Sequence, residues 1–269
     1  MSGMTVPVRR RRGAAGAWLL AAAAVFGFFN ARPLCAQVAG NTTPSDSSEA
    51  GSEPPVMDNQ IMGHVWFDQL EGRSNGPDNE FRWEGEGWVG TDMNKLWFKS
   101  EGFAENGRAT DGDTEALYDR PIPFLRYFDA QAGVRYDLDS NPGRTWGAIG
   151  IEGLAPYFFE FAPTFYFSDG GRIAGRVEGS YDLMLTQRLI AQPQFEINMY
   201  STKDPSRGIG SGFSDLDTGL RIRYELSRKF APYIGFAYTG AFGQTATYTR
   251  EAGGAAHDPR LIFGTRVWY

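Results

Sequence analysis

Apolar and polar residues alternate with a period of two in one segment after another of this 269-residue chain. Between Phe128 and Leu138 the even positions are apolar, whereas the odd positions include Asp129, Arg135 and Asp137. Successive side chains of a β-strand point to opposite faces, so this segment has one apolar and one polar face. After residue 36 there is no apolar run of the roughly 18 residues that suggest a membrane-spanning helix.

The alternating segments predict twelve strands, most of them as long as the roughly 9–11 residues with which a tilted barrel strand crosses a membrane. An even number returns both chain ends to one side, as in single-chain outer-membrane barrels. Aromatic residues make up 14% of the chain, which fits such a barrel but also an aromatic-rich soluble sandwich. The expected strands are Gln60–Gln69, Asn79–Val89, Lys95–Phe103, Thr114–Arg120, Phe128–Leu138, Thr145–Leu154, Tyr157–Phe167, Ile173–Leu185, Arg188–Tyr200, Asp215–Leu226, Phe230–Phe242 and Arg260–Tyr269.

The connectors favour the membrane barrel over the sandwich. Short connectors follow even-numbered strands, and longer ones follow most odd-numbered strands, up to Ser201–Ser214 and Gly243–Pro259. Short periplasmic turns and longer outer loops are typical of outer-membrane barrels. Pro121–Tyr127 is long for a periplasmic turn, but the alternating row that ends at Tyr269 resembles the terminal signal of such proteins. We therefore expect an all-β fold, an antiparallel transmembrane outer-membrane β-barrel of about twelve strands.

The first 59 residues predict two further segments. Arg9–Arg12, an apolar stretch over Ala14–Phe29 and a small residue at Ala36 indicate a signal peptide over residues 1–36 rather than a membrane anchor. Residues 37–59 are rich in small, polar and acidic residues and are expected to form a disordered periplasmic arm before the barrel at 60–269. The single cysteine, Cys35, falls inside the signal peptide, so the mature chain is expected to lack disulfides and thiolate metal sites.

Polar faces of the strands carry charges of both signs, which would line the lumen if the apolar faces meet lipid. Two interpretations stay open: the charges pair and replace a core, or they gate or attract a cation. Tryptophans and tyrosines near strand ends suit interfacial girdles, although Trp66 shares a face with His64 and Asp68. The charges are Arg82, Glu84, Glu86, Lys95, Lys99, Glu101, Arg176, Glu178, Asp182, Asp217, Arg221, Arg223 and Glu225, and the other aromatic residues are Trp88, Trp97, Tyr157, Tyr200 and Trp268.

Composition disfavours several functions. A net charge of −6 provides no basic surface for nucleic acid. Histidine is limited to His64 and His257, neither in a setting that predicts a hydrolytic triad, so we expect no enzyme activity.

Met62 and His64 are two residues apart in the first expected strand, on the face opposite Ile61 and Val65. Thioether and imidazole ligands suit copper, and Cu(I) in particular, better than hard cations. Met57, Met93 and Met184 are expected at the same end of the barrel. These five residues form the predicted metal site, although methionine is also a common packing residue.

Several long stretches resemble the copper resistance protein B family of outer-membrane proteins. They include PVMDNQIMGHVWFDQLEGR at Pro55–Arg73, RWEGEGWVGTDMNKLWFKSEG at Arg82–Gly102 and YDLMLTQRLIAQPQFEINMY at Tyr181–Tyr200. The resemblance covers almost all of residues 55–269. It implies a cell outer membrane protein that binds copper and helps export or sequester it from the periplasm, beside a periplasmic multicopper oxidase.

One departure from the family matters. Members often carry a segment rich in Met and His before the barrel, whereas Val38–Asp58 contains one Met and no His. The alternative function is therefore a general small-solute channel or structural barrel without a metal role.

Overall fold

We describe a computed structural model over residues 60–76, 79–105, 107–138 and 143–269. The predicted signal peptide (1–36), the predicted arm (37–59) and Met57 lie outside the described residues and stay predictions. Among the described residues, no helix is both long and apolar enough to cross a membrane.

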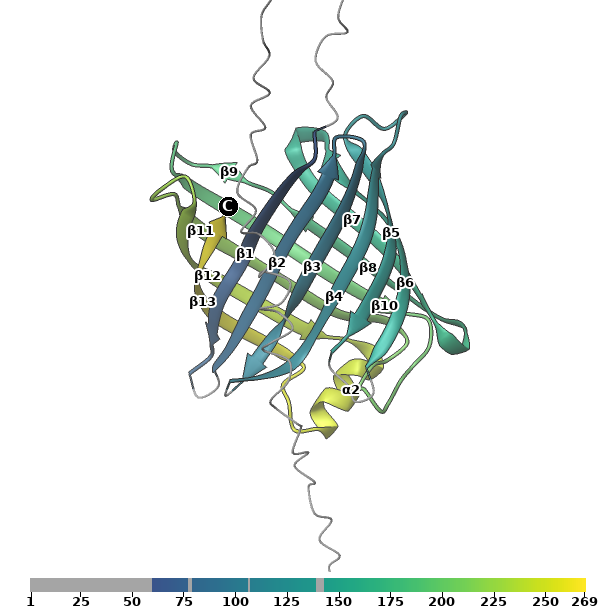
Figure 1. Cartoon of the computed structure of the whole chain (residues 1–269). Coiled ribbons are helices and arrows are strands. Elements are labelled where there is room, and N and C mark those ends of the chain that lie inside the picture. The colour runs from purple at the N-terminus through teal and green to yellow at the C-terminus, as the bar shows by residue number, and fades with distance from the viewer. Residues whose placement is uncertain (1–59, 77–78, 106, 139–142) are drawn as a thin grey trace, which may run out of the picture. The chain divides into compact units, whose positions relative to one another are not determined.

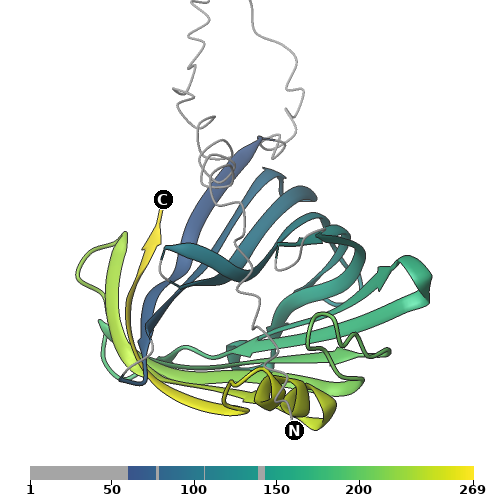
Figure 2. The same ribbon diagram turned by 90° about the horizontal axis from the view of Figure 1, so that it is seen from below.

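Twelve long strands form one closed antiparallel barrel, as predicted (Figures 1 and 2). Neighbours in the sequence pair with one another, and β1 pairs with β13 while β10 pairs with β8 and β11, which closes the sheet. The strands are β1 (Met62–Ser74), β2 (Asn79–Thr91), β3 (Asn94–Glu105), β4 (Arg108–Pro121), β5 (Phe128–Asp137), β6 (Arg144–Ala155), β7 (Phe159–Ser168), β8 (Arg172–Ser180), the two-residue β9 (Leu183–Met184), β10 (Leu189–Tyr200), β11 (Gly212–Tyr224), β12 (Phe230–Ala241) and β13 (His257–Trp268).

β1 differs from the predicted strand because it contains a β-bulge. Phe67 pairs with Gly85, and the next pair is Gln69 with Glu84, so Asp68 has no partner across the ladder. An extra residue reverses the alternation beyond it. The prediction that this strand ends at Gln69 was therefore wrong: β1 continues to Ser74 in the opposite phase.

Most other strands differ from the predicted bounds by one to three residues, and two differ by more. β4 begins at Arg108 rather than Thr114, because its outer half is polar and shows no apolar alternation. The predicted strand Ile173–Leu185 is interrupted after Ser180 and resumes as β9. Opposite the interruption lies Pro193 of β10, which has no backbone N–H to donate to the ladder.

The barrel is apolar outside and charged inside, the reverse of a soluble protein. Ile149 of β6, Phe165 of β7 and Ile234 of β12 are 58%, 59% and 68% exposed, respectively. By contrast, Glu71 and Arg73 of β1 are buried in the interior. An apolar outer band around a polar interior is the pattern of a transmembrane barrel, whose outer surface meets membrane lipid.

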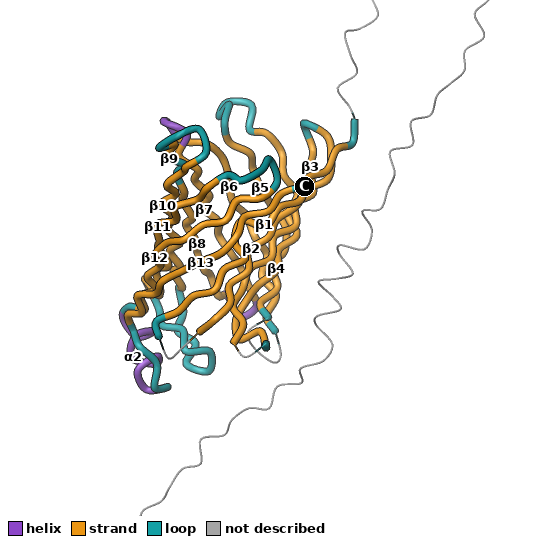
Figure 3. The backbone as a smooth tube through the Cα atoms, turned by 90° about the vertical axis from the view of Figure 1, so that its left-hand side faces the viewer, coloured by secondary structure: helices purple, strands orange, loops and turns teal. Residues whose placement is uncertain are grey.

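The two ends of the barrel differ. Short turns and both ends of the described chain lie at one end, which faces the periplasm in outer-membrane barrels. At the opposite end lies α2 (Gly243–Glu251), as Figures 1 and 3 show. The sequence predicted only a loop there. α2 contacts the β10–β11 loop, where Thr245 accepts a hydrogen bond from the Gly210 amide at 2.9 Å.

Candidate functional site

Ion pairs cross the interior of the barrel. The Arg82 guanidinium of β2 lies 3.3 Å from a carboxylate oxygen of Glu196 on β10 and 3.4 Å from one of Asp217 on β11. It also pairs with Glu84 and Glu101 on its own side, at 3.3 Å each. One buried cation thus joins four carboxylates from four strands.

A second arginine makes a similar crossing. Arg176 of β8 pairs with Glu101 of β3, and its Nη2 donates to Asp113 of β4 at 2.8 Å. Its Nε lies 3.4 Å from Glu196. Glu101 and Glu196 therefore each pair with both Arg82 and Arg176, so the two arginines belong to one network.

The network continues into β1 beyond the bulge. Arg73 donates to Glu71 and to Asp217 at 2.7 Å each, and Arg221 of β11 donates to Glu71 at 3.0 Å. The side chains of Arg73 and Glu71 are 0% exposed. Buried charges of this kind are tolerated because they are paired and hydrogen-bonded. The predicted pairing of lumen charges is present. Glu71 and Arg73 were not among the predicted lumen residues, because the first strand was predicted to end at Gln69.

Part of the interior is apolar and aromatic. Leu117, Trp146, Ala148, Tyr166 and Ala174 form a buried cluster against which Trp97 and Tyr200 pack. Trp97 and Tyr200 are therefore among the aromatic residues that point inward, and they do not form part of an interfacial girdle. Tyr157, by contrast, is 87% exposed in the β6–β7 turn, as a girdle residue would be.

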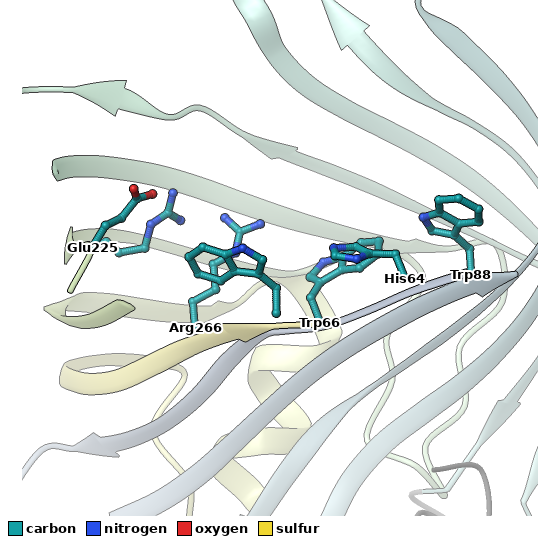
Figure 4. Close-up of a pocket in the computed structure, with 7 residues that line it drawn as sticks. His64, Trp66, Trp88, Glu225 and Arg266 are labelled. Carbon is teal, nitrogen blue, oxygen red and sulfur yellow. The ribbon is translucent and has the colours of Figure 1, made fainter. Parts of the chain in front are cut away.

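An open cavity of about 350 Å³ lies inside the barrel at the end that carries the short turns. Figure 4 shows its side chains extending from the strands toward one space. Three tryptophans, two arginines, one histidine and one glutamate form its lining: His64, Trp66, Trp88, Arg223, Glu225, Arg266 and Trp268. Trp66, Trp88 and Trp268 thus line this cavity. The inward position of Trp66 agrees with the face that it shares with His64 and Asp68, whereas a girdle position for Trp88 and Trp268 was wrong.

His64 is held among aromatic rings and lies beside Trp66. The centroids of these two rings are 5.1 Å apart at an interplanar angle of 34°. Trp66 donates its indole N–H to Asp68 at 2.6 Å, and Asp68 pairs with Arg266 at 2.8 Å. The bulge residue therefore anchors both an indole and a guanidinium of the cavity wall.

The structure brings together only part of the predicted metal set. His64 of β1 lies opposite Trp88 of β2, and both line the cavity. Met62 precedes His64 by two residues in the same strand, opposite Gly90, so Met62 and His64 belong to the same inward row. Met93 lies in the exposed β2–β3 turn at the same end. Met184 also lies at this end, but β10, β11, β12 and β13 separate its strand from β1. Met57 is outside the described residues.

Two clusters of carboxylates bring their oxygens within 4.8 Å of one another: Asp68, Glu84 and Glu86, and Glu101, Glu178 and Glu196. The first cluster combines residues of β1 and β2, and the second combines residues of β3, β8 and β10, so sequence spacing alone did not reveal either of them. Asp68 pairs with Arg266, Glu86 lies 3.9 Å from Lys99, and the other four carboxylates pair with Arg82 or Arg176. Because each of these carboxylates pairs with a basic side chain, we assign the clusters to the ion-pair lining of the lumen.

Comparisons with known proteins agree with this architecture. Residues 61–269 match the family described as copper resistance protein B precursor (CopB). A copper resistance protein B of Escherichia coli is 40% identical over 214 residues, which is 80% of this chain and 72% of the relative. A copper resistance protein B homolog of Pseudomonas syringae pv. tomato is 36% identical over the same shares.

Solved barrels show a more distant likeness. The NanC porin has a TM-score of 0.48 and 11% identity, with 77% of this chain and 99% of the porin covered. The KdgM porin in complex with disordered oligogalacturonate has a TM-score of 0.42 and 11% identity, with 77% and 98% covered. The family match and the two curated relatives, in contrast, cover most of the barrel, and the chain belongs to the copper resistance protein B family.

Proposed function

We propose that this barrel binds copper at its periplasmic mouth, with Met62 and His64 as ligands, and thereby helps export or sequester copper from the periplasm. The proposal rests on one observation: Met62 and His64 are neighbours in the inward row of β1, at the mouth of the cavity. Met62 is 48% exposed, so an incoming ion reaches it. Thioether and imidazole donors favour Cu(I).

The cross-lumen ion pairs favour sequestration over free passage. An ion that moves from the mouth to the far end must pass Arg82 and Arg176, two buried guanidinium groups that carry positive charge. Both groups are buried, and their ion pairs join facing walls across the lumen, which obstructs the path of an ion. We therefore expect copper to be retained at the mouth or passed back to a periplasmic partner.

A periplasmic multicopper oxidase of the same resistance system is the partner that we propose. The site opens toward the compartment in which such an enzyme resides, and both proteins would use the same copper pool. We propose no catalytic role for the barrel itself. Of the two histidines, His64 lies in the mouth cavity, and His257 shares a hydrogen bond of 2.7 Å with the Tyr238 hydroxyl.

The test is a Cu(I) titration of the detergent-solubilised mature chain against a chromogenic chelator. We expect one tightly bound equivalent, which Met62→Leu or His64→Ala weakens and the double variant abolishes. Matched controls are Met199→Leu, a methionine near the outer-loop end of β10, and His257→Ala, also at the far end of the barrel. Equal binding by the double variant and the parent chain would refute the site.

The alternative function, a small-solute channel or structural barrel without a metal role, predicts a different result. Such a channel would give a steady conductance in planar bilayers that copper does not alter. The ion pairs across the lumen disfavour it, and we expect low conductance from the parent chain.

A further inference from the structure

The mouth cavity is larger and differently lined than a site for a bare copper ion requires. Its volume of about 350 Å³ lies within the roughly 300–1,000 Å³ typical of small-molecule sites. Two of its seven lining residues are arginines and only one, Glu225, is a carboxylate. Guanidinium groups repel a free cation, so copper binding by Met62 and His64 leaves most of this lining unexplained.

Arg223 has unused hydrogen-bonding capacity. Its side chain is buried, and it donates from Nη2 to Asp182 at 2.7 Å and from Nη1 to Gln192 at 3.3 Å. Its Nε is also buried but has no hydrogen-bond partner among the described residues. A buried donor without an acceptor costs free energy, which an acceptor atom of a ligand would recover.

Arg266 contributes a second guanidinium to the cavity wall. Asp68 orients it through an ion pair of 2.8 Å, and its guanidinium lies 5.9 Å from the ring centroid of Trp268. The planar guanidinium group matches the geometry of a carboxylate and can bind both of its oxygens.

The tryptophans supply the apolar part of the site. The indole N–H of Trp66 is bound to Asp68, and its ring contacts the rings of His64 and Trp97. The part of the ring that lines the cavity offers an apolar surface. Trp268 lies opposite Trp66, and Trp88 lies opposite His64, so the three indoles line the same cavity. Flat indole surfaces favour a flat or apolar ligand body.

We propose that the mouth cavity binds a small organic carboxylate with a flat apolar body. Arg223 and Arg266 hold its carboxylate, and Trp66, Trp88 and Trp268 enclose its apolar part. The binding needs no metal ion and therefore goes beyond the proposed copper function.

The experiment compares phenylacetate with its neutral analogue phenylacetamide. Each is titrated into the metal-free mature chain in detergent, with isothermal calorimetry and tryptophan emission as readouts. We expect saturable binding of phenylacetate, at least about tenfold tighter than that of phenylacetamide, because only the anion forms charge-assisted hydrogen bonds. Added salt should weaken phenylacetate binding and leave phenylacetamide binding unchanged.

Variants of the two arginines locate the binding. Arg223→Gln and Arg266→Gln should each weaken phenylacetate binding by about tenfold or more. The matched control is Arg228→Gln, an exposed arginine in the β11–β12 turn at the same end of the barrel. Heat-dependent mobility in detergent gels shows that each variant forms a barrel.

Three results would overturn the proposal: no saturable phenylacetate binding by the folded parent chain, equal affinity for the acid and the amide, or an equal loss in the Arg228→Gln control. Because every titration is done without copper, none of these results bears on the copper site. Failure of the Cu(I) titration likewise leaves this inference intact.

Discussion

Arg82 of β2 lies 3.3 Å from Glu196 of β10, although β1, β13, β12 and β11 separate these two strands on the shorter path around the barrel. The contact therefore spans the lumen rather than the sheet. It allows the barrel to dispense with an apolar core through part of its height, because opposite walls are joined by charge.

Replacing Arg82 with alanine should strongly destabilise the barrel. The variant leaves Glu84, Glu101, Glu196 and Asp217 with less compensating charge, and breaking a buried pair costs about 3–5 kcal/mol. Denaturant unfolding in detergent micelles measures the loss. Exposed Arg228→Ala is the control and should change the free energy of unfolding by less than about 0.5 kcal/mol. Similar values for the two variants would contradict the structural role of the network.

Removing both lumen-crossing arginines should also change conductance. Arg82→Ala with Arg176→Ala deletes the two cations that join β2 and β8 to the facing walls. We expect this double variant to conduct ions in planar bilayers more than the parent chain does, with a preference for cations because the carboxylates remain. An unchanged conductance would mean that other side chains close the lumen.

The strand pattern could be predicted from the sequence because its signals are local. The alternation in β5 and the short turns after even-numbered strands depend on neighbouring residues, and they yielded the number of strands. The bulge at Asp68 could not be predicted, because it depends on which residue of β2 lies opposite. Its consequence, the inward position of Glu71 and Arg73, was missed for the same reason.

The candidate site was predictable only within one strand. Spacing placed Met62 and His64 on one face, and both belong to the inward row. Sequence alone did not show that Trp88 lies opposite His64 or that Trp268 lies opposite Trp66, because these pairings depend on the registers of β2 and β13. It also grouped Met184 with Met62, although four long strands separate them.

Met184 should accordingly not contribute to copper binding. It is 74% exposed on β9, on the far side of β10 to β13 from Met62. We expect Met184→Leu to leave the Cu(I) affinity of the mature chain unchanged, whereas Met62→Leu lowers it by about tenfold or more. Competition with a chelator measures both. Equal losses would show that the copper ligands come from both sides of the mouth.

A charge on the outer face should be costly where the barrel crosses the hydrocarbon. Ile149 lies near the middle of β6, 58% exposed, and pairs with Ala132 and Phe165 of the neighbouring strands. Ile149→Arg should make folding into lipid vesicles less favourable by about 2–4 kcal/mol, which is the cost of an arginine at the bilayer midplane. Tyr157→Arg, in the β6–β7 turn, should cost at most about 1 kcal/mol. Equal costs at the two positions would contradict the membrane placement.

The β10–β11 loop should lose stability in acid through Asp204. Burial acts to raise the pKa of this carboxyl group, but hydrogen bonds from Ser206 at 2.5 Å and Arg144 at 2.7 Å outweigh it. Arg207, at 3.9 Å, acts in the same direction, so the pKa of Asp204 lies below its ordinary value. A lowered folded-state pKa means that the ionised form stabilises the loop.

That stabilisation is fully present above the ordinary aspartate pKa of about 3.9 and is lost as the pH falls through the lowered value. The amide of Ile209, which donates to the Asp204 carbonyl at 3.0 Å, reports on the loop. Its hydrogen-exchange protection factor should be higher in the parent chain than in Asp204→Asn at neutral pH, and the two should converge in acid. Asp169→Asn is the control, since that side chain is 85% exposed and should show no such difference at Ile209. A gap between the parent chain and Asp204→Asn that stays constant with pH would mean that the charge of Asp204 does not hold the loop.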